Sequence, residues 1–520
     1  MATAPSVLAL ISVSDKQGLL PFAEGLVEAG FQLLSTGGTL SALKAGGLPV
    51  QSVAEYTGQP EILGGRVKTL HPRIHGGILG RPELASDAAQ MAVQAITPIS
   101  LVVVNLYPFR ETVARGAGWD EAIENIDIGG PAMIRAAAKS ADRVTVVVDP
   151  ADYGAVREAY RTGGPDAPLR RALQRKAFAH TAAYDAAISG WLAQQAGGEA
   201  RFPEQLQPTF QRVQPLRYGE NPHQAAAFYR TSTPEAGATV GGARVLQGKE
   251  LSWNNLLDLD AALRLALEFP GGPCAVIIKH NTPCGVAKGS TLEAAFRAAR
   301  AADEVSAFGG IVAFTREVDE PTARAMSEGF LEAALAPSFS DAARAVLAAK
   351  KNLRLLEVGD GLLSGAGGTP PLEFRSVSGG VLVQERDHAE PTLQWQVVTK
   401  RAPTAAEDEA LRFAWRVCKH VKSNAIVFAN AGQLLAAGGG QTSRVDSVKI
   451  AAARGGEALR GSAVASDAFF PFRDGLDAAA AAGATCVVQP GGSVRDAEVI
   501  AAADAHGMAM VFTGVRHFRH

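Results

Sequence analysis

Short runs of apolar residues alternate with stretches of helical spacing in the first part of the chain. Consecutive apolar residues are typical of strands buried on both faces, and apolar side chains three or four residues apart are typical of helices. The pattern predicts strands over 7–11, 31–34, 100–104 and 144–148, with a helix over 16–29. This rhythm predicts an α/β fold, a mostly parallel sheet with helices on both faces.

A second α/β unit is predicted after a chiefly helical segment over 151–195, in which Ala-rich helical patterns run through 169–195. Residues 197–215 mix Gly, Pro, Gln and charge with little periodicity, as linkers do. We therefore place domains over 1–200 and 201–520, the second divided by a loop near 361–371. Strand-like runs resume in that second domain at 274–279, 311–314, 425–429, 485–489 and 509–512.

Composition narrows the functional classes. Hydrophobic residues make up 47% and charged residues 20%, typical of a soluble globular protein, and the net charge of -2 predicts no nucleic-acid or membrane partner. The apolar stretches are too short to span a bilayer, and Met1–Pro5 lacks the charged start of a signal peptide. Four scattered cysteines without zinc-site spacing predict no structural zinc and a cytoplasmic protein.

One segment of the first domain could bind an anion at a helix N-terminus. The segment Ser35–Thr39 lies between a strand and a helix, and Ser14 and Lys16 follow the neighbouring strand. Equally, Gly37 and Gly38 could form a tight turn with Thr39 as a helix cap. The pattern leaves a phosphate loop and a capped turn both open.

The segment Asp127–Pro131 predicts a helix start with Pro131 at the first helical position. Arg135 and Lys139 lie four residues apart on one face of that helix, so a carboxylate and cations could surround one cavity. The alternative is a solvated face with a cap.

In the segment Arg66–Pro72, Lys68 and His71 could hold phosphate or polarise a carbonyl, or could be ordinary exposed loop residues.

The second domain carries a Lys–His pair at the end of a predicted strand. Lys279 could stabilise developing negative charge, while His280 could shuttle a proton. Successive strand residues point to opposite faces, so both reach one pocket only where the pleat breaks, and we expect Pro283 and Gly285 to supply that break. The alternative is an exposed loop.

Two further polar loops could complete that site. In Leu216–Gln224, Arg217 could bind phosphate through a forked contact, and after Cys418 the residue Asn424 could orient an amide or amine. Each loop taken alone is more often hydrogen-bonded structure than a site.

Taken together and in order, these motifs resemble the bifunctional purine-biosynthesis family that joins 5-aminoimidazole-4-carboxamide ribonucleotide (AICAR) formyltransferase to inosine monophosphate (IMP) cyclohydrolase. The resemblance covers nearly the whole chain. The segments that carry it are Ser12–Lys16, Ser35–Thr39, Arg66–Pro72, Asn105–Phe109, Asp127–Gly130, Ala138-Lys139, Leu216–Gln224, Lys279-His280, Ser306–Gly310, Ser423-Asn424 and Arg516–His520.

The resemblance implies a methylglyoxal-synthase-like cyclohydrolase domain followed by a formyltransferase of two cytidine-deaminase-like subdomains, here without a zinc set. It implies the last two steps of IMP synthesis: formyl transfer from 10-formyltetrahydrofolate to AICAR, then closure of formyl-AICAR with loss of water. It also implies an intertwined homodimer whose transferase sites use both subunits.

The resemblance also suggests roles for individual residues. For formyl transfer it suggests Lys279, His280 and Asn424 as catalytic residues, and Arg217, Tyr218, His223, Glu332 and Arg516 as substrate-binding residues. For cyclisation it suggests Lys68, Tyr107, Asp127 and Lys139, with the nucleotide held by Ser14, Lys16, Ser35, Thr36, Gly38, Thr39 and Arg66. Arg519 departs from relatives that end in His-His, which leaves the role of that side chain open.

Two other functions stay open at this point. One is a single-activity IMP cyclohydrolase with a structural C-terminal half. The other is a nucleotide-sensing or scaffold protein that binds ligands without turnover. The retained Lys279, His280 and Asn424 argue against both.

Overall fold

The computed structural model describes residues 7–195, 202–231, 237–362, 371–387 and 395–520. The chain divides into two compact units, Met1–Thr209 and Phe210–His520. Residues 197–201 of the linker expected over 197–215, most of the expected loop at 361–371, and Met1–Pro5 lie outside the described residues; the described end of the expected linker runs into a strand, β6 (Phe210–Leu216). Within the described ranges, no helix combines the length and apolar character needed to cross a membrane.

The first unit is built on a wholly parallel five-stranded sheet in the order β3-β2-β1-β4-β5. The four predicted strands are all present, and the three-residue β3 is an addition too short to show a pattern. The strands are β1 (Val7–Ser12), β2 (Phe31–Ser35), β3 (Val50–Ser52), β4 (Ile99–Val104) and β5 (Thr145–Val147). Because the strands are parallel, the loops after β1, β2 and β4 share one edge of the sheet.

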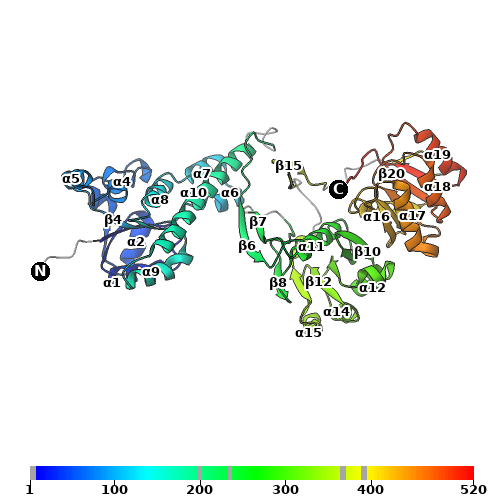
Figure 1. Cartoon of the computed structure of the whole chain (residues 1–520), viewed down its shortest axis with the longest axis horizontal. Helices are drawn as coiled ribbons and strands as arrows, with labels where there is room; N and C mark the ends of the chain where they lie inside the picture. The colour runs from blue at the N-terminus through cyan, green and yellow to red at the C-terminus, as the bar shows by residue number, and fades with distance from the viewer. Residues whose placement is uncertain (1–6, 196–201, 232–236, 363–370, 388–394) are drawn as a thin grey trace. The chain divides into compact units, whose positions relative to one another are not determined.

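Helices cover this sheet, and the long α10 lies against α8 and β5 (Figure 1). The helices of the first unit are α1 (Leu19–Glu28), α2 (Gly37–Ala45), α3 (Val53–Thr57), α4 (Pro72–Leu79), α5 (Ala85–Val93), α6 (Phe109–Ala114), α7 (Trp119–Glu124), α8 (Gly129–Lys139), α9 (Tyr153–Arg161) and α10 (Ala167–Gln195). Helix α8 begins at Gly129, so Pro131 is its third residue and not its first. The early start follows from Asp127, whose Oδ1 accepts the Gly130 N–H at 2.8 Å.

The second unit contains two lobes that repeat one order of elements: a helix, a hairpin, and three further helix–strand steps. The first lobe consists of β8 (Arg244–Gln247), α11 (Trp253–Ala266), β9 (Cys274–Lys279), β10 (Thr282–Lys288), α12 (Leu292–Ala302), α13 (Glu304–Ala307), β11 (Gly310–Phe314), α14 (Glu320–Ser327), β12 (Leu331–Ala336), α15 (Asp341–Leu347) and β13 (Arg354–Glu357). The second lobe consists of β16 (Gln396–Val397), α16 (Ala405–Cys418), β17 (Ile426–Ala429), β18 (Leu434–Gly438), α17 (Arg444–Gly455), β19 (Ala463–Ser466), α18 (Arg473–Ala481), β20 (Cys486–Gln489), α19 (Asp496–Ala505) and β21 (Ala509–Phe512).

Each lobe has a six-stranded mixed sheet, in the orders β10-β9-β11-β12-β13-β8 and β18-β17-β19-β20-β21-β16. In both, the first hairpin strand pairs antiparallel with its two neighbours, and the next three strands run parallel. The lobes share one apolar core that includes α11, α16 and the inner faces of both sheets. Separate cores under α12, α14 and α15, and under α17, α18 and α19, cover the outer faces.

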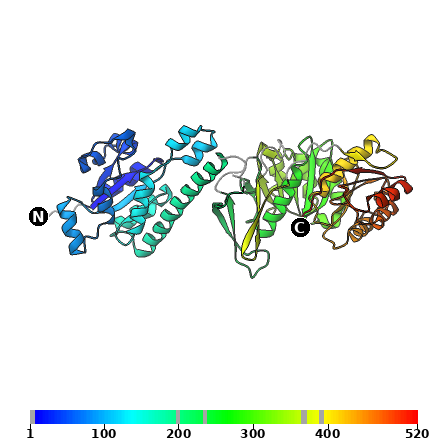
Figure 2. The same cartoon turned by 90° about the horizontal axis from the view of Figure 1, so that it is seen from above.

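Two hairpins stand beside these lobes: β6 (Phe210–Leu216) with β7 (Ala226–Thr231), and β14 (Leu372–Val377) with β15 (Gly380–Glu385). Figure 2 shows the green β6–β7 pair as an extended ribbon. The rings of Phe210 and Phe374 meet edge to face at 6.2 Å, so the two hairpins contact each other.

Candidate active sites

The shared edge of the parallel sheet brings together several predicted residues of the first unit. Asn105, which follows β4, ties the neighbouring loop in place, because its Oδ1 accepts the backbone N–H groups of Ser14 at 2.5 Å and Asp15 at 3.0 Å. Lys16 donates to the Ser14 carbonyl at 3.3 Å and lies over α2, with Nζ 3.8 Å from where a Cβ on Gly38 would be. Asn105 lies in the Asn105–Phe109 motif, but the sequence does not single it out as a site residue.

The hydroxyl groups of the predicted phosphate loop are already engaged. Ser35 Oγ donates to the Ile11 carbonyl at 2.7 Å, and Thr39 Oγ1 bonds both backbone groups of Val13 at 2.9 Å. Thr36 is the N-cap residue of α2 but makes no capping bond; its hydroxyl donates to Glu61 Oε1 at 2.6 Å. The alternative in which Thr39 caps the helix is therefore wrong.

Lys68 lies over the start of α2. Its Nζ is 3.3 Å from where a Cβ on Gly37 would be and 3.7 Å from the same position on Gly65. An ammonium beside a helix N-terminus brings two positive potentials together, which favours a bound anion between them. The Glu61 carboxylate, with Oε2 3.5 Å from the same Gly65 position, lies at this place in the structure.

Asp127 lies beside the same loop. The backbone N–H groups of Gly130 and Tyr107 hydrogen-bond its carboxylate, and the Tyr184 hydroxyl lies 2.9 Å from its backbone N. Burial raises the pKa of Asp127, against the opposing effects of these N–H groups and of the Lys68 charge. Asp127 and Lys68 are thus close enough to interact electrostatically.

The remaining predicted residues of the first unit lie further out. Tyr107 is 41% exposed and is not a packed aromatic. Arg66 forms a surface ion pair with Glu124. Lys139 is exposed at the far end of α8, about 15 Å along the helix axis from Gly129 at 1.5 Å per residue. The structure therefore does not bring Lys139 to Asp127 within this unit.

In the second unit, Lys279 and His280 lie where β9 turns into β10. Lys279 pairs with Thr282 across a two-residue turn, and His280 and Asn281 both have left-handed backbones, with φ of 52° and 59°. This tight turn interrupts the pleat at His280 and Asn281, and the pairing register of β10 with β9 shifts between Pro283 and Gly285, the two residues predicted to supply a break. They lie inside β10, and Gly285 is small because a Cβ there would meet the Ala299 carbonyl at 2.1 Å.

The turn holds the two side chains differently. Lys279 Nζ donates to the carbonyls of Phe308 at 3.1 Å and Gly309 at 3.0 Å, which fixes the ammonium at the sheet end. His280 is exposed. Asn281 N–H donates to Asp258 Oδ1 at 2.7 Å, and Asp258 is a residue that the sequence pattern did not single out.

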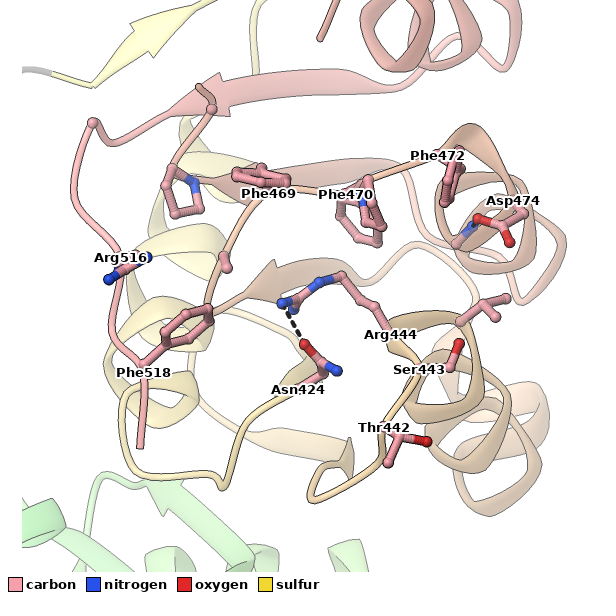
Figure 3. A pocket seen from close by; sticks show the side chains of 17 residues that line it. Asn424, Thr442, Ser443, Arg444, Phe469, Phe470, Phe472, Asp474, Arg516 and Phe518 are labelled. Carbon is pink, nitrogen blue, oxygen red and sulfur yellow. Dashed lines mark hydrogen bonds between the residues drawn. The ribbon is translucent and has the colours of Figure 1, made fainter. Parts of the chain in front are cut away.

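A cavity of about 680 Å³ opens in the second lobe, at the carboxyl ends of β19 and β20 and along the terminal segment (Figure 3). Its walls carry aromatic rings, backbone turns and two arginines. The lining residues with labelled side chains are Asn424, Thr442, Ser443, Arg444, Phe469, Phe470, Phe472, Asp474, Arg516 and Phe518. Of the predicted residues, Asn424 and Arg516 line it.

Arg444 holds Asn424 in place. Its Nη2 donates to Asn424 Oδ1 at 2.8 Å (Figure 3), and its Nη1 donates to Asp467 Oδ1 at 2.5 Å. The Asn424 amide donates to the Gln441 carbonyl at 2.9 Å. Arg444 and Asp467 are buried, and Ser423 donates to the other Asp467 oxygen. Neither residue was predicted, since an Arg or Asp outside a recognisable motif gives no local signal.

The other predicted transferase residues lie elsewhere. Arg217 stacks over Tyr218 at 5.6 Å in the loop between β6 and β7, which also carries the exposed His223. Glu332 on β12 pairs with Arg354 at 2.9 Å. Among the described residues, the lining of the cavity includes neither this loop, nor Glu332, nor the Lys279-His280 turn.

These features define a two-unit α/β protein with basic side chains near one edge of a parallel sheet and a cavity lined by aromatic rings and two arginines in a duplicated second unit. Comparisons with known proteins agree. The family model "AICARFT/IMPCHase bienzyme" matches residues 137–454, and the model "MGS-like domain" matches residues 18–132.

Full-length relatives match as well. A "Bifunctional purine biosynthesis protein PurH" of Myxococcus xanthus (strain DK1622) is 68% identical over 99% of this chain and 100% of its own length. One of Anaeromyxobacter dehalogenans (strain 2CP-1 / ATCC BAA-258) is 57% identical over 98% and 99%. The "Crystal structure of ForH" matches 35% of this chain and 97% of its own at 39% identity, with a TM-score of 0.32.

The chain belongs to the AICAR formyltransferase/IMP cyclohydrolase bienzyme family. It catalyses the last two steps of IMP synthesis, formyl transfer to AICAR with a folate co-substrate and closure of formyl-AICAR to IMP. The single-activity alternative is not favoured, because the match covers both units.

Proposed function

We propose that formyl transfer takes place between the Lys279-His280 turn and the cavity beside Asn424, with 10-formyltetrahydrofolate as the donor. The AICAR amine attacks the formyl carbon, a C–N bond forms, and the bond from that carbon to the folate nitrogen breaks. His280 takes the proton of the amine and returns one to the folate nitrogen. Lys279 stabilises the negative oxygen of the tetrahedral intermediate.

The fixed ammonium of Lys279 is the observation that carries this proposal. Two carbonyls already hold Nζ, so little reorganisation accompanies the appearance of negative charge. Asn424, held by Arg444, would orient the carboxamide of AICAR. Arg516 and Arg217 would bind its phosphate, with Tyr218, His223 and Glu332 completing the substrate site.

We also propose that two copies of the chain share each transferase site in a homodimer. The proposal is supported by the separation, within one chain, of the cavity lining from the Lys279-His280 turn. Exposed apolar side chains on the two hairpins offer a surface for the second copy. They include Phe210 at 48%, Tyr229 at 51%, Val381 at 52% and Leu382 at 59% exposure.

For the cyclisation, we propose that Lys68, Asp127 and Tyr107 act on formyl-AICAR, while Ser14, Lys16, Ser35, Thr36, Gly38, Thr39 and Arg66 hold its phosphate. The amide nitrogen attacks a formyl carbon in the same molecule, so positioning supplies much of the rate. The carboxylate of Asp127 would orient or deprotonate the amide, and Lys68 would stabilise the oxygen that leaves as water. Lys139 remains a prediction from the resemblance, and the free thiols fit a cytoplasmic enzyme.

Purified enzyme with AICAR and 10-formyltetrahydrofolate tests both assignments, with folate release and IMP followed together. His280→Ala should lose folate release and still convert supplied formyl-AICAR to IMP. Asp127→Asn should do the reverse. His506→Ala, a surface histidine paired with Asp477 at 2.8 Å, is the matched control and should keep both activities. Retained folate release in His280→Ala would overturn the transferase assignment.

A further inference from the structure

The carboxylate of Asp258 lies under the turn that carries His280. Asp258 is a half-buried residue of α11, and its Oδ1 accepts the Asn281 N–H at 2.7 Å. The backbone N–H of His280 also hydrogen-bonds this carboxylate. One side chain from a neighbouring helix therefore binds both consecutive N–H groups of the turn.

These bonds matter because the turn is strained. Histidine and asparagine both have positive φ here, a region that side chains with a Cβ enter at a cost, and histidine is bulkier than the glycine usually found there. Charge-assisted hydrogen bonds from two N–H groups to one carboxylate offset that cost. Without them, the turn could relax toward other conformations and move the imidazole.

The charged groups around Asp258 are consistent with a carboxylate that stabilises the turn. Burial raises the pKa of Asp258, against the N–H groups of the turn and the charges of His280 and Lys279. On β10, Cys284 faces Asp258, Lys279 and also Asp303, and burial raises the pKa of its thiol to about 12, so it stays neutral. Asp258 thus binds the backbone of the turn and is close enough to its two basic side chains to interact with their charges.

We propose that Asp258 is a positioning residue for formyl transfer, which fixes the His280-Asn281 turn and thereby the direction of the His280 imidazole. The inference rests on the proposed role of His280. It assigns to Asp258 no contact with AICAR or folate, so its effect on the reaction passes through the histidine.

The first test compares Asp258→Asn with wild type. We expect kcat for formyl transfer to fall at least tenfold, while the KM for AICAR changes by less than about threefold and the conversion of formyl-AICAR to IMP stays unchanged. Asp319→Asn is the matched control: Asp319 accepts the Thr322 N–H at 3.0 Å in the same lobe but caps α14, and this variant should keep its kcat.

The pH profile separates positioning of the histidine from general damage. Asp258→Asn removes a negative charge that favours a protonated base beside it and keeps almost the same side-chain shape. The acidic limb of the kcat profile should therefore move to lower pH in Asp258→Asn. A lower kcat with an unmoved limb would mean that the substitution acts without changing the histidine's surroundings, and would overturn the proposal.

Double variants decide whether Asp258 acts through His280. In a His280→Ala background, Asp258→Asn should slow the small residual rate of formyl transfer, measured at high enzyme concentration, no further, because the residue it positions is gone. An equal further loss would show independent action and overturn the proposal. A wild-type rate for Asp258→Asn beside an inactive His280→Ala would overturn this inference alone, whereas an active His280→Ala would overturn the proposed function.

A rescue variant guards against a folding defect. Asn281→Gly removes the strain at one turn position while keeping the N–H, so it should restore part of the kcat lost in Asp258→Asn. Thermal unfolding of each variant reports the folded fraction. If Asp258→Asn is folded but slow, and the double variant Asp258→Asn with Asn281→Gly is equally slow, Asp258 does not act by holding the turn.

Discussion

Arg444 Nη2 lies 2.8 Å from Asn424 Oδ1, and the same guanidinium contacts the buried carboxylate of Asp467. Arg444 binds the oxygen of the Asn424 amide, and the Gln441 carbonyl accepts a hydrogen bond from its nitrogen. These two hydrogen bonds fix the orientation of the amide at the cavity. An amide held at both ends is well suited to orient a carboxamide substrate. The orientation therefore depends on a residue that lies behind the predicted one.

Arg444→Lys tests that dependence. A lysine ammonium cannot reproduce a planar fork, so Asn424 should lose its fixed orientation and kcat for formyl transfer should fall by roughly 100-fold. The conversion of formyl-AICAR to IMP should be unaffected. Arg412→Lys, on an exposed pair with Asp408 at 2.8 Å, is the control, and equal losses in both variants would contradict the prediction.

The hydrogen bond between Thr36 and Glu61 places a carboxylate at the proposed phosphate site, so we expect this carboxylate to weaken the binding of IMP. The Glu61 carboxylate lies where the α2 N-terminus and Lys68 favour an anion, and a bound phosphate would be repelled by it. Glu61→Gln keeps the hydrogen-bonding shape and removes the charge, so IMP should bind about 3- to 10-fold more tightly by calorimetry. Glu83→Gln, on a surface ion pair, should leave the affinity unchanged. Weaker IMP binding in Glu61→Gln would show that the carboxylate supports the site.

Asp127→Asn should abolish cyclisation and raise the free energy of unfolding at pH 7. Burial raises the pKa of Asp127 above 3.8, so its contribution to stability is full below pH 3.8 and is lost as pH rises through the raised pKa. A neutral asparagine does not carry that cost. At pH 7 the variant should be more stable by about 0.5–2 kcal/mol while cyclisation is lost. Thermal unfolding should show the gain disappearing below pH 3.8; a constant gain would contradict this origin.

Glu268→Gln should destabilise the second unit. Although burial opposes ionisation, hydrogen bonds and charges from His420 and Lys419 hold the pKa of Glu268 at about 2. That stabilisation is present above pH 4.5 and is lost as pH falls from 4.5 toward 2. Removing one member of this buried group should cost about 3–5 kcal/mol at pH 7, measured by denaturant unfolding. Equal losses at pH 7 and pH 3 would contradict the assignment.

The sequence predicted strands that are buried on both faces where their apolar runs are rich in Val, Ile and Leu, whereas the equally buried but Ala-rich β12 and β19 were not predicted. β1 and β4 read as unbroken apolar runs because helices cover both sides of the parallel sheet, and the same holds for β9 and β17. β10 was missed because Pro283 and Gly285 resemble a loop. Its glycine is dictated by the close approach of α12, which no local pattern records.

The duplication of the second unit could not be read from the sequence either. The two lobes repeat one order of strands and helices without a readable repeat in the sequence, since sheet topology depends on which apolar faces are buried and tolerates many different residues.

By itself, the sequence determined the two α/β units, the apolar strands that carry polar residues at their ends, and the motifs that place the chain in its family. Only the tertiary structure decided which side chains meet. Glu61 reaches Thr36, Asp258 reaches the His280 turn, and Arg444 reaches Asn424, each across at least 20 positions of the chain. Such pairs form because folding brings distant backbone segments within hydrogen-bond distance, and a single sequence records each partner as an ordinary polar residue.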